Sequence, residues 1–437
     1  MEMIELVVDL GRARSGADPF AFEWGTQEYI RRLSSGARRA ATLGWSDALR
    51  DDIQALTRTP PSSEARARLG ALLRAFLLGL GWELDEAALL EAVARGQPVC
   101  VRLCFAAAEL FVLPWEVLAV GEAGRTLGSL EGVYVRYTWP GVTIAPPLEP
   151  KSAERLLFLW SDRGGRVPAR QHTDALTELA EGGAAPEIVA SAGYGDLARA
   201  LRQAHDEGRP FTRLHLLAHG APTADGRGIG LALDDGVVDA LTLAELIGTF
   251  TTNLRGVTLC ACRSSDPGLM ESVLGSVARE LHRCGVQSVV ASRFPLSVQG
   301  SVLLTQTLYK ELDKIGGGWD RAVGLARRAL RESEWAADAS AIQHYCAAPI
   351  AAPSAKVSLD PAPRPTPRMA QAATVQSRDL TVLRDRVKRF WIEGLLTRTL
   401  QGAEPVEVLK ETRPEAVERP WEGVLEVPHK ELSLIHI

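Results

Sequence analysis

The sequence contains no uninterrupted apolar run long enough to cross a membrane. Its most apolar stretch, residues 104–120, is broken by Glu109, Pro114 and Glu116, whereas a membrane helix needs about 20 apolar residues. Nothing at the N-terminus resembles a secretory signal peptide. The six cysteines lack the spacing of a secreted disulfide framework. We therefore expect a cytoplasmic protein with reduced thiols and no membrane partner.

Strong charge of either sign is also missing. The net charge of −5 over 437 residues is mild, which disfavours a surface dedicated to nucleic acid. Internal repeats are absent, and so is the Gly-x-x-x-x-Gly-Lys-Ser/Thr pattern of a phosphate-binding loop. With 46% hydrophobic and 24% charged residues, the chain has the composition of a globular protein, and its length allows two or three domains.

Between residues 154 and 335, short apolar runs alternate with segments of helical length. We expect strands at 156–160, 187–190 and 286–292, and in the two runs that lead to His219 and Cys262. Between and after them we expect helices at 171–180, 194–205, 241–250, 269–283, 297–312 and 319–331. This alternation predicts an α/β fold with a mainly parallel sheet. Uniformly apolar strands indicate helices on both faces of that sheet.

The remaining segments suggest a division of the chain. Residues 1–150 are expected to form an N-terminal α/β subdomain, with strands at 4–10, 99–103 and 133–137 and a helix at 65–80, and residues 151–346 the catalytic core. The Ala- and Pro-rich residues 347–378 predict a linker. Helical periodicity returns in residues 379–431. The last six residues, 432–437, match the translated end of a sequencing transposon and are treated as an artefact.

Two neighbouring strands of the predicted sheet lead to reactive side chains. His219 and Gly220 follow Leu216-Leu217-Ala218, and Cys262 ends the run Val257-Thr258-Leu259-Cys260-Ala261. Because parallel strands bring their carboxyl ends to one edge of a sheet, a base and a thiol would face each other there. His219 precedes Cys262 by 43 residues, and caspases have a histidine about 50 residues before an Ala-Cys-Arg cysteine. The pattern predicts a cysteine peptidase in which Cys262 is the nucleophile, His219 the base, and the Gly220 N–H an oxyanion donor.

Other cysteines and histidines compete for these roles. Cys260 lies within its strand and is interpreted as a core residue, as is His215 in the preceding strand. His344 and Cys346 have no position at a strand end, and a structural role is favoured for both. Cys100 and Cys104 lack nearby Cys or His partners, so we predict no metal site. The peptidase core is likewise expected to need no cofactor.

Acidic residues near the cleft are candidates for selecting a basic substrate side chain, as an aspartate does in trypsin. They are Asp225, Asp234, Asp235 and Asp266. The alternative is that Asp234-Asp235-Gly236 forms only a turn, since Asp and Gly are common in turns. Proximity in sequence does not decide between the two.

These residues resemble the CHAT family of caspase-like proteins over about residues 95–345. The matching segments are Leu113-Pro114-Trp115-Glu116, Tyr134-Val135-Arg136-Tyr137, Ala218-His219-Gly220, Leu259-Cys260-Ala261-Cys262 and Gly285-Val286-Gln287-Ser288-Val289-Val290-Ala291-Ser292. The resemblance implies a caspase-like three-layer sandwich with His219 and Cys262 as the dyad. The chain departs from the family where Cys260 stands in place of a usual serine, which leaves the dyad intact.

Residues 379–431 are similar to the lead-in of bacterial STAND-type (NACHT-like) ATPases. The motifs are Phe390-Trp391-Ile392-Glu393-Gly394-Leu395-Leu396, Arg413-Pro414-Glu415-Ala416-Val417 and Pro420-Trp421. This resemblance implies that a nucleotide-binding module follows and that the natural protein is longer. ATP and magnesium would serve only that module, which would also self-associate. The whole would be a protease effector of an antiphage or programmed-death system.

The sequence thus predicts a caspase-like cysteine endopeptidase that acts on protein or peptide substrates. Two alternatives stay open: a non-catalytic adaptor that keeps the caspase-like fold for docking, and an acyl- or amide-transferring cysteine enzyme. A plugged cleft would favour the adaptor, and a narrow closed pocket would favour the transferase.

Overall fold

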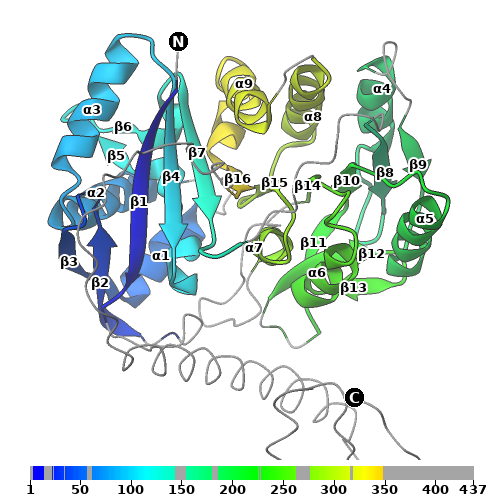
Figure 1. The fold of residues 1–437 in the computed structure, drawn as a ribbon, viewed down its shortest axis with the longest axis horizontal. Coiled ribbons are helices and arrows are strands. Elements are labelled where there is room, and N and C mark those ends of the chain that lie inside the picture. Colours follow the sequence, from blue (N-terminus) through cyan, green and yellow to red (C-terminus); the bar gives the residue numbers. More distant parts are fainter. Residues whose placement is uncertain are drawn as a thin grey trace, which may run out of the picture. The chain divides into compact units, whose positions relative to one another are not determined.

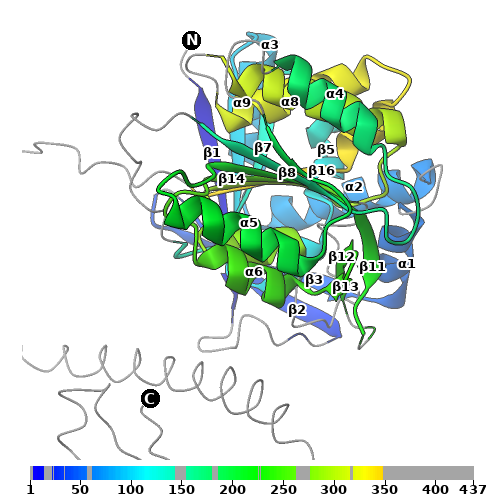
Figure 2. The same cartoon turned by 90° about the vertical axis from the view of Figure 1, so that its right-hand side faces the viewer.

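A computed structural model describes residues 3–13, 22, 24–33, 35–56, 62–142, 154–179, 186–224, 226, 228–261, 276–314 and 318–347. Residues 1–353 belong to one compact unit. In this unit eleven strands form a single, mostly parallel sheet with helices on both of its faces (Figures 1 and 2). The predicted α/β fold with a mainly parallel, helix-flanked sheet is therefore confirmed.

The sheet contains two parallel blocks of strands and, at one end, the antiparallel strands β2 and β3. Its strands, in spatial order, are β3 (Arg38–Trp45), β2 (Gly25–Arg32), β1 (Ile4–Arg12), β4 (Val99–Phe105), β7 (Val133–Thr138), β16 (Ile342–Cys346), β15 (Ser288–Ser292), β14 (Gly256–Cys260), β10 (Arg213–Leu217), β8 (Leu156–Trp160) and β9 (Glu187–Val189). The pairs β1/β2, β2/β3 and β15/β16 are antiparallel, and the other neighbours are parallel. The β15/β16 pair is thus the seam between a half built on β1, β4, β7 and β16 and a half built on β15, β14, β10, β8 and β9.

Helices complete a three-layer arrangement (Figure 2). One face of the sheet carries α4 (Ala169–Leu179), α8 (Val298–Leu312) and α9 (Trp319–Arg331), and the other carries α5 (Tyr194–Asp206) and α6 (Ala240–Gly248), with α7 (Val277–Arg283) packed beside α6. Ser297 and Asp239 cap the N-termini of α8 and α6 with their side-chain oxygens, as such residues commonly do. The N-terminal part adds α1 (Asp47–Ala55), α2 (Ser63–Gly79) and α3 (Glu83–Ala94).

Smaller elements fill the connections. Between β4 and β7 lie the 3-10 helices η1 (Ala108–Val112), η2 (Trp115–Val117) and η3 (Leu127–Ser129) and the short strands β5 (Ala119–Val120) and β6 (Arg125–Thr126). After β10 comes a separate antiparallel sheet of β11 (His219–Pro222), β12 (Ile229–Leu233) and β13 (Gly236–Val238). The 3-10 helix η5 (Ala336–Ser340) precedes β16.

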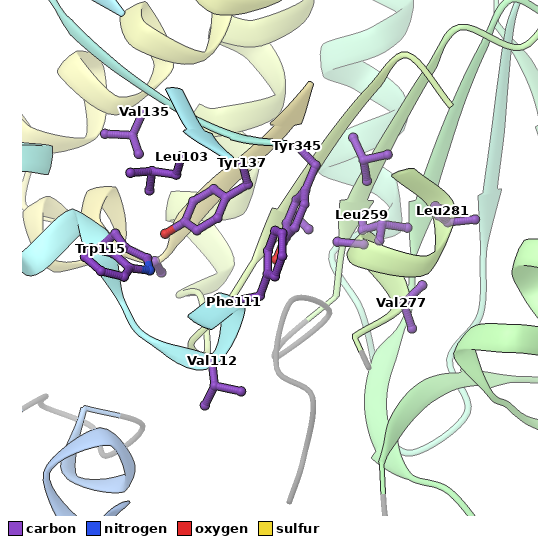
Figure 3. Packing of buried hydrophobic residues seen from close by; sticks show 14 of the residues in the cluster. Leu103, Phe111, Val112, Trp115, Val135, Tyr137, Leu259, Val277, Leu281 and Tyr345 are labelled. Atoms are coloured by element: carbon purple, nitrogen blue, oxygen red, sulfur yellow. The ribbon is translucent and has the colours of Figure 1, made fainter. Parts of the chain in front are cut away.

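The core lies on both faces of the sheet because its central strands are buried on both sides. All five residues of β10, β14, β15 and β16 are buried. Near the seam the rings of Phe111, Tyr137 and Tyr345 lie together, with Trp115 to one side and Leu259 to the other (Figure 3). These aromatic contacts join a 3-10 helix, β7 and β16, and so link segments more than 200 residues apart.

Sequence patterns located most elements, and the exceptions are informative. The helix at 319–331 and the strand at 156–160 occur at the predicted residues. Of the predicted helix at 269–283, the described part forms α7, and residues 262–275 lie outside the described ones. The strands β2, β3 and β16 were not predicted. Strands from the expected N-terminal subdomain and from the expected core share one sheet.

The predictions for residues beyond 347 lie outside the described part of the chain, namely the rest of the linker, the ATPase-like lead-in and the terminal artefact. In the part that is described, none of the helices combines the length and the apolar character that a membrane span would require.

Candidate active site

His219 stands at the carboxyl edge of the central strands. β10 ends at Leu217, which pairs in parallel with Cys260 at the end of β14. His219 therefore lies two residues beyond the last paired residue of β10, and Cys262 stands at the equivalent place in the sequence after β14. Cys262 itself lies outside the described residues, as do Asp225 and Asp266. Their predicted roles stay predictions.

The imidazole of His219 is held by a backbone carbonyl. Its Nε2 lies 3.0 Å from the carbonyl oxygen of Gly165. A carbonyl only accepts hydrogen bonds, so Nε2 carries the proton and Nδ1 of a neutral ring keeps its lone pair. A half-buried histidine with a fixed tautomer and one basic nitrogen can act as a general base.

The loop that supplies this carbonyl has a backbone suited only to glycine. Gly164 and Gly165 have φ values of +90° and +140°, a region that other residues rarely adopt. A Cβ on Gly165 would lie 3.4 Å from His219 Nε2. The loop is closed by hydrogen bonds from the Gly165 N–H to the Asp162 carbonyl (3.0 Å) and from the Val167 N–H to the Asp162 carboxylate (2.9 Å).

Asp234, one of the predicted substrate-binding residues, fastens this loop. It lies in the turn between β12 and β13, where its carboxylate accepts a 2.5 Å hydrogen bond from Ser161 Oγ. Its carbonyl accepts from Arg163 Nη1 at 2.8 Å. A chain of contacts therefore runs from Asp234 through residues 161–165 to His219. Binding of substrate by Asp234 stays a prediction beside this observed contact.

Asp235 caps a helix. Its carboxylate accepts from the N–H groups of Tyr194 (2.8 Å) and Gly195 (3.1 Å) at the start of α5. A carboxylate there is favoured by the positive end of the helix dipole. Gly193 makes room for it, since a Cβ at that position would approach the carboxylate to 2.6 Å. Asp234 and Asp235 thus form the turn between β12 and β13, as the alternative interpretation predicted. Substrate binding by Asp235 stays a prediction.

Gly220 lies next to His219 in β11 and pairs with Leu231 of β12. The position places a residue without a side chain directly beside the base. Its proposed part in binding an oxyanion stays a prediction.

The competing cysteines and histidines lie elsewhere, and all of them are buried except Cys104, which is half-buried. Burial raises the pKa of the Cys100 and Cys346 thiols to about 12 and that of Cys104 to about 11. Since the thiolate is the nucleophile, these three are unsuited to attack. His344 is buried in β16, with its Nε2 2.7 Å from Ser288 Oγ.

Cys260 and His215 are buried as well and face α8. Cys260 Sγ lies 3.6 Å from Thr305 Oγ1, and His215 Nδ1 lies 3.2 Å from the Tyr309 hydroxyl. Both side chains therefore lie in the core and not beyond the carboxyl ends of β10 and β14.

The sequence did not point to Ser161, Arg163 or Gly165. The available signal is the Gly164-Gly165 pair shortly after the predicted strand at 156–160, which indicates a backbone that needs positive φ. The contact with His219 has no sequence signal, because 54 residues separate the two partners.

Comparisons with known proteins assign the chain to a family. A family model described as CHAT domain matches residues 83–354. Comparison with curated proteins finds no match. Among solved structures, the chain is similar to two crystal structures of the Saccharomyces cerevisiae separase–securin complex. One, at 3.0 Å resolution, has 11% identity and a TM-score of 0.35 over 57% of this chain. The other, at 2.6 Å resolution, has 10% identity and a TM-score of 0.38 over 70%. The match spans only 15% and 20% of those chains.

Proposed function

The chain belongs to the CHAT-domain family, and on this premise we propose that it is a cysteine endopeptidase whose catalytic dyad is His219 and Cys262. One observation carries the proposal. His219 donates from Nε2 to the Gly165 carbonyl, which leaves Nδ1 as a base. It does so at the sheet edge toward which β14, the strand preceding Cys262, also runs.

The proposed reaction follows from these positions. His219 Nδ1 takes the proton of the Cys262 thiol, and the thiolate attacks the carbonyl carbon of the scissile peptide. Backbone N–H groups, with that of Gly220 among them, stabilise the oxyanion. The protonated imidazole then gives its proton to the leaving amine. Water, deprotonated by the same nitrogen, hydrolyses the thioester and restores the thiol.

The Gly165 carbonyl supports both proton transfers. It accepts the Nε2 proton and so keeps the imidazole in one orientation and one tautomer while Nδ1 takes up and releases a proton. Asp234, Ser161 and Arg163 hold the loop and are therefore positioning residues.

For the substrate, the proposal concerns only the charge of the side chain that the site prefers. Asp234 and Asp235 already have structural contacts, so Asp225 and Asp266 become the first candidates for selecting a basic side chain. The similarity of residues 379–431 to STAND-type ATPases supports a role as the effector of a longer signalling protein. That protein would self-associate to activate the peptidase.

Covalent labelling tests the dyad. Acyloxymethyl-ketone peptides with a basic, an acidic or an apolar residue before the warhead would be added to the full chain and to Cys262→Ala, His219→Ala, Cys260→Ala and Cys284→Ala. We expect labelling to disappear in Cys262→Ala and to slow by about 10²–10⁴-fold in His219→Ala, the usual contribution of a general base. The probe that labels fastest identifies the preferred side chain.

Two control thiols make the result interpretable. Cys260 is the rival nucleophile. Cys284 is a half-buried thiol at the C-terminal end of α7, and burial raises its pKa to about 11. Both variants should keep their labelling. Labelling that survives in Cys262→Ala, or no labelling of the wild type even when the chain is forced to dimerise, would overturn the proposal and favour the docking adaptor.

A further inference from the structure

A second group of reactive side chains lies in the core, around β10 and β14. It takes no part in the proposed reaction. His172 on α4, His215 on β10 and Cys260 on β14 each offer one ligand atom, and these atoms lie within 4.8 Å of one another. The two histidines are fully buried, and the cysteine is 4% exposed. Thr305 on α8 adds a hydroxyl, 3.2 Å from His172 Nδ1 and 3.6 Å from Cys260 Sγ.

The outer hydrogen bonds of this group determine where its protons lie. Ser301 Oγ donates to the Val298 carbonyl at 2.7 Å, so it accepts from His172 Nε2 at 3.2 Å. His172 therefore has its proton on Nε2 and a lone pair on Nδ1. The Thr305 hydroxyl donates to the Ser301 carbonyl at 2.9 Å and turns its own lone pairs toward the same nitrogen.

The same reasoning applies to the second histidine. The Tyr309 hydroxyl donates to Thr258 Oγ1 at 3.1 Å, so it accepts from His215 Nδ1 at 3.2 Å. In this arrangement His215 Nε2 has a lone pair, and so does His172 Nδ1. The two nitrogens are 3.1 Å apart. Two facing lone pairs in a buried site repel each other unless a cation lies between them.

Both imidazoles are fully buried. A charged imidazolium is costly in such a place, and the neutral imidazole is the form that binds metals.

We propose that His172 Nδ1, His215 Nε2 and Cys260 Sγ bind a structural Zn²⁺ ion, with Thr305 Oγ1 as the neighbouring oxygen. On binding, the Cys260 thiol loses its proton to solvent and the zinc–sulfur bond forms. Two nitrogens bound to tetrahedral zinc at about 2.0–2.1 Å are about 3.3 Å apart, close to the observed 3.1 Å. Each imidazole also donates its other N–H to a hydroxyl, the outer support that zinc-binding histidines commonly have.

The site departs from the sequence prediction of no metal. It would tie α4, β10, β14 and α8 together just before the chain reaches His219 and Cys262. None of its three ligands takes part in the proposed peptidase reaction.

Cobalt titration of the full chain tests the proposal, because Co²⁺ replaces Zn²⁺ and reports its ligands by absorption. After chelator treatment, the wild type should bind one equivalent with a thiolate-to-cobalt charge-transfer band, and added Zn²⁺ should abolish the band. Cys260→Ser should lose the band, whereas Cys100→Ser, a matched buried strand cysteine, should keep it. Tyr309→Phe should weaken binding by about 10–100-fold, the usual effect of removing an outer-shell partner.

Cys262→Ala separates this site from the proposed dyad and should retain the band. The proposal is overturned if the wild type binds no stoichiometric cobalt. This outcome does not depend on whether any variant folds. It is also overturned if the band survives Cys260→Ser or is lost with Cys262→Ala, since the metal would then lie elsewhere.

Discussion

At the scale of single residues, catalysis is expected to depend on Gly165, which takes no part in the bond-making steps. Gly165 adopts φ +140°, and its carbonyl holds His219 Nε2. In Gly165→Ala the positive φ strains the backbone, and the new Cβ would lie in contact with Nε2 at 3.4 Å. We expect the probe-labelling rate to fall by about 10–100-fold, part of what a general base contributes, with a loss of about 1–3 kcal/mol in stability from backbone strain.

Gly208→Ala is the matched control for this prediction. Gly208 also has positive φ (+68°), but nothing lies within 4 Å of the position of its Cβ. It should lose similar stability in urea unfolding and keep its labelling rate. Equal labelling rates in the two variants would show that the Gly165 carbonyl does not position His219.

At the scale of elements, a buried ion pair connects η2, β7, α9 and β16. The Glu116 carboxylate accepts from Tyr137 Oη (2.7 Å) and from Arg327 Nη2 (3.3 Å), and Arg327 also donates to the Ile342 carbonyl. Burial raises the pKa of Glu116. Arg327→Met leaves this carboxyl without its counter-ion, so we expect a loss of about 3–5 kcal/mol in the free energy of unfolding, measured by urea denaturation.

The neighbouring Arg328 provides the comparison. Its pairs with Glu131 and Glu332 are exposed, and Arg328→Met should cost less than about 1 kcal/mol. The double variant Glu116→Gln/Arg327→Met should recover much of the loss, because no charge is then left buried. If Arg327→Met is no worse than Arg328→Met, the pair does not stabilise these elements. The contacts with Tyr137 and Arg327 satisfy the buried carboxylate of Glu116, the last residue of the Leu-Pro-Trp-Glu motif.

At the scale of the whole molecule, two buried neutral histidines predict sensitivity to acid. Burial lowers the pKa of His282 on α7 and His344 on β16 to about 4. The unfolded chain takes up protons at these rings below about pH 6.5, but the folded protein does so only near pH 4. Acidification in this window therefore favours unfolding, by about 3 kcal/mol for each ring.

Urea denaturation between pH 7 and pH 4 measures this effect. The free energy of unfolding should be highest near neutral pH and should decrease steadily below about pH 6.5. His282 accepts a hydrogen bond from the Trp139 N–H, and His282→Gln, which keeps an acceptor but does not titrate, should have a shallower decrease. A free energy of unfolding that stays constant from pH 7 to pH 4.5 would contradict the prediction.

The sequence by itself determined the α/β class and the position of His219 beyond a central strand. Local patterns suffice for these features, because a doubly covered strand must be apolar and a helix must repeat its apolar residues every three or four positions. The carboxyl ends of parallel strands then share an edge whatever the rest of the chain does.

Only the tertiary structure decided the seam and the contacts around the site. β16 joins the two halves of the sheet although its polar Gln343 and His344 hide its strand pattern, and these side chains are satisfied by Tyr137 and Ser288. Three further contacts join residues 43 to 88 positions apart. They are the hydrogen bond between His219 and the Gly165 carbonyl, the hydrogen bond between Asp234 and Ser161, and the group of His172, His215 and Cys260. Such contacts depend on how helices and strands pack, which no local pattern records.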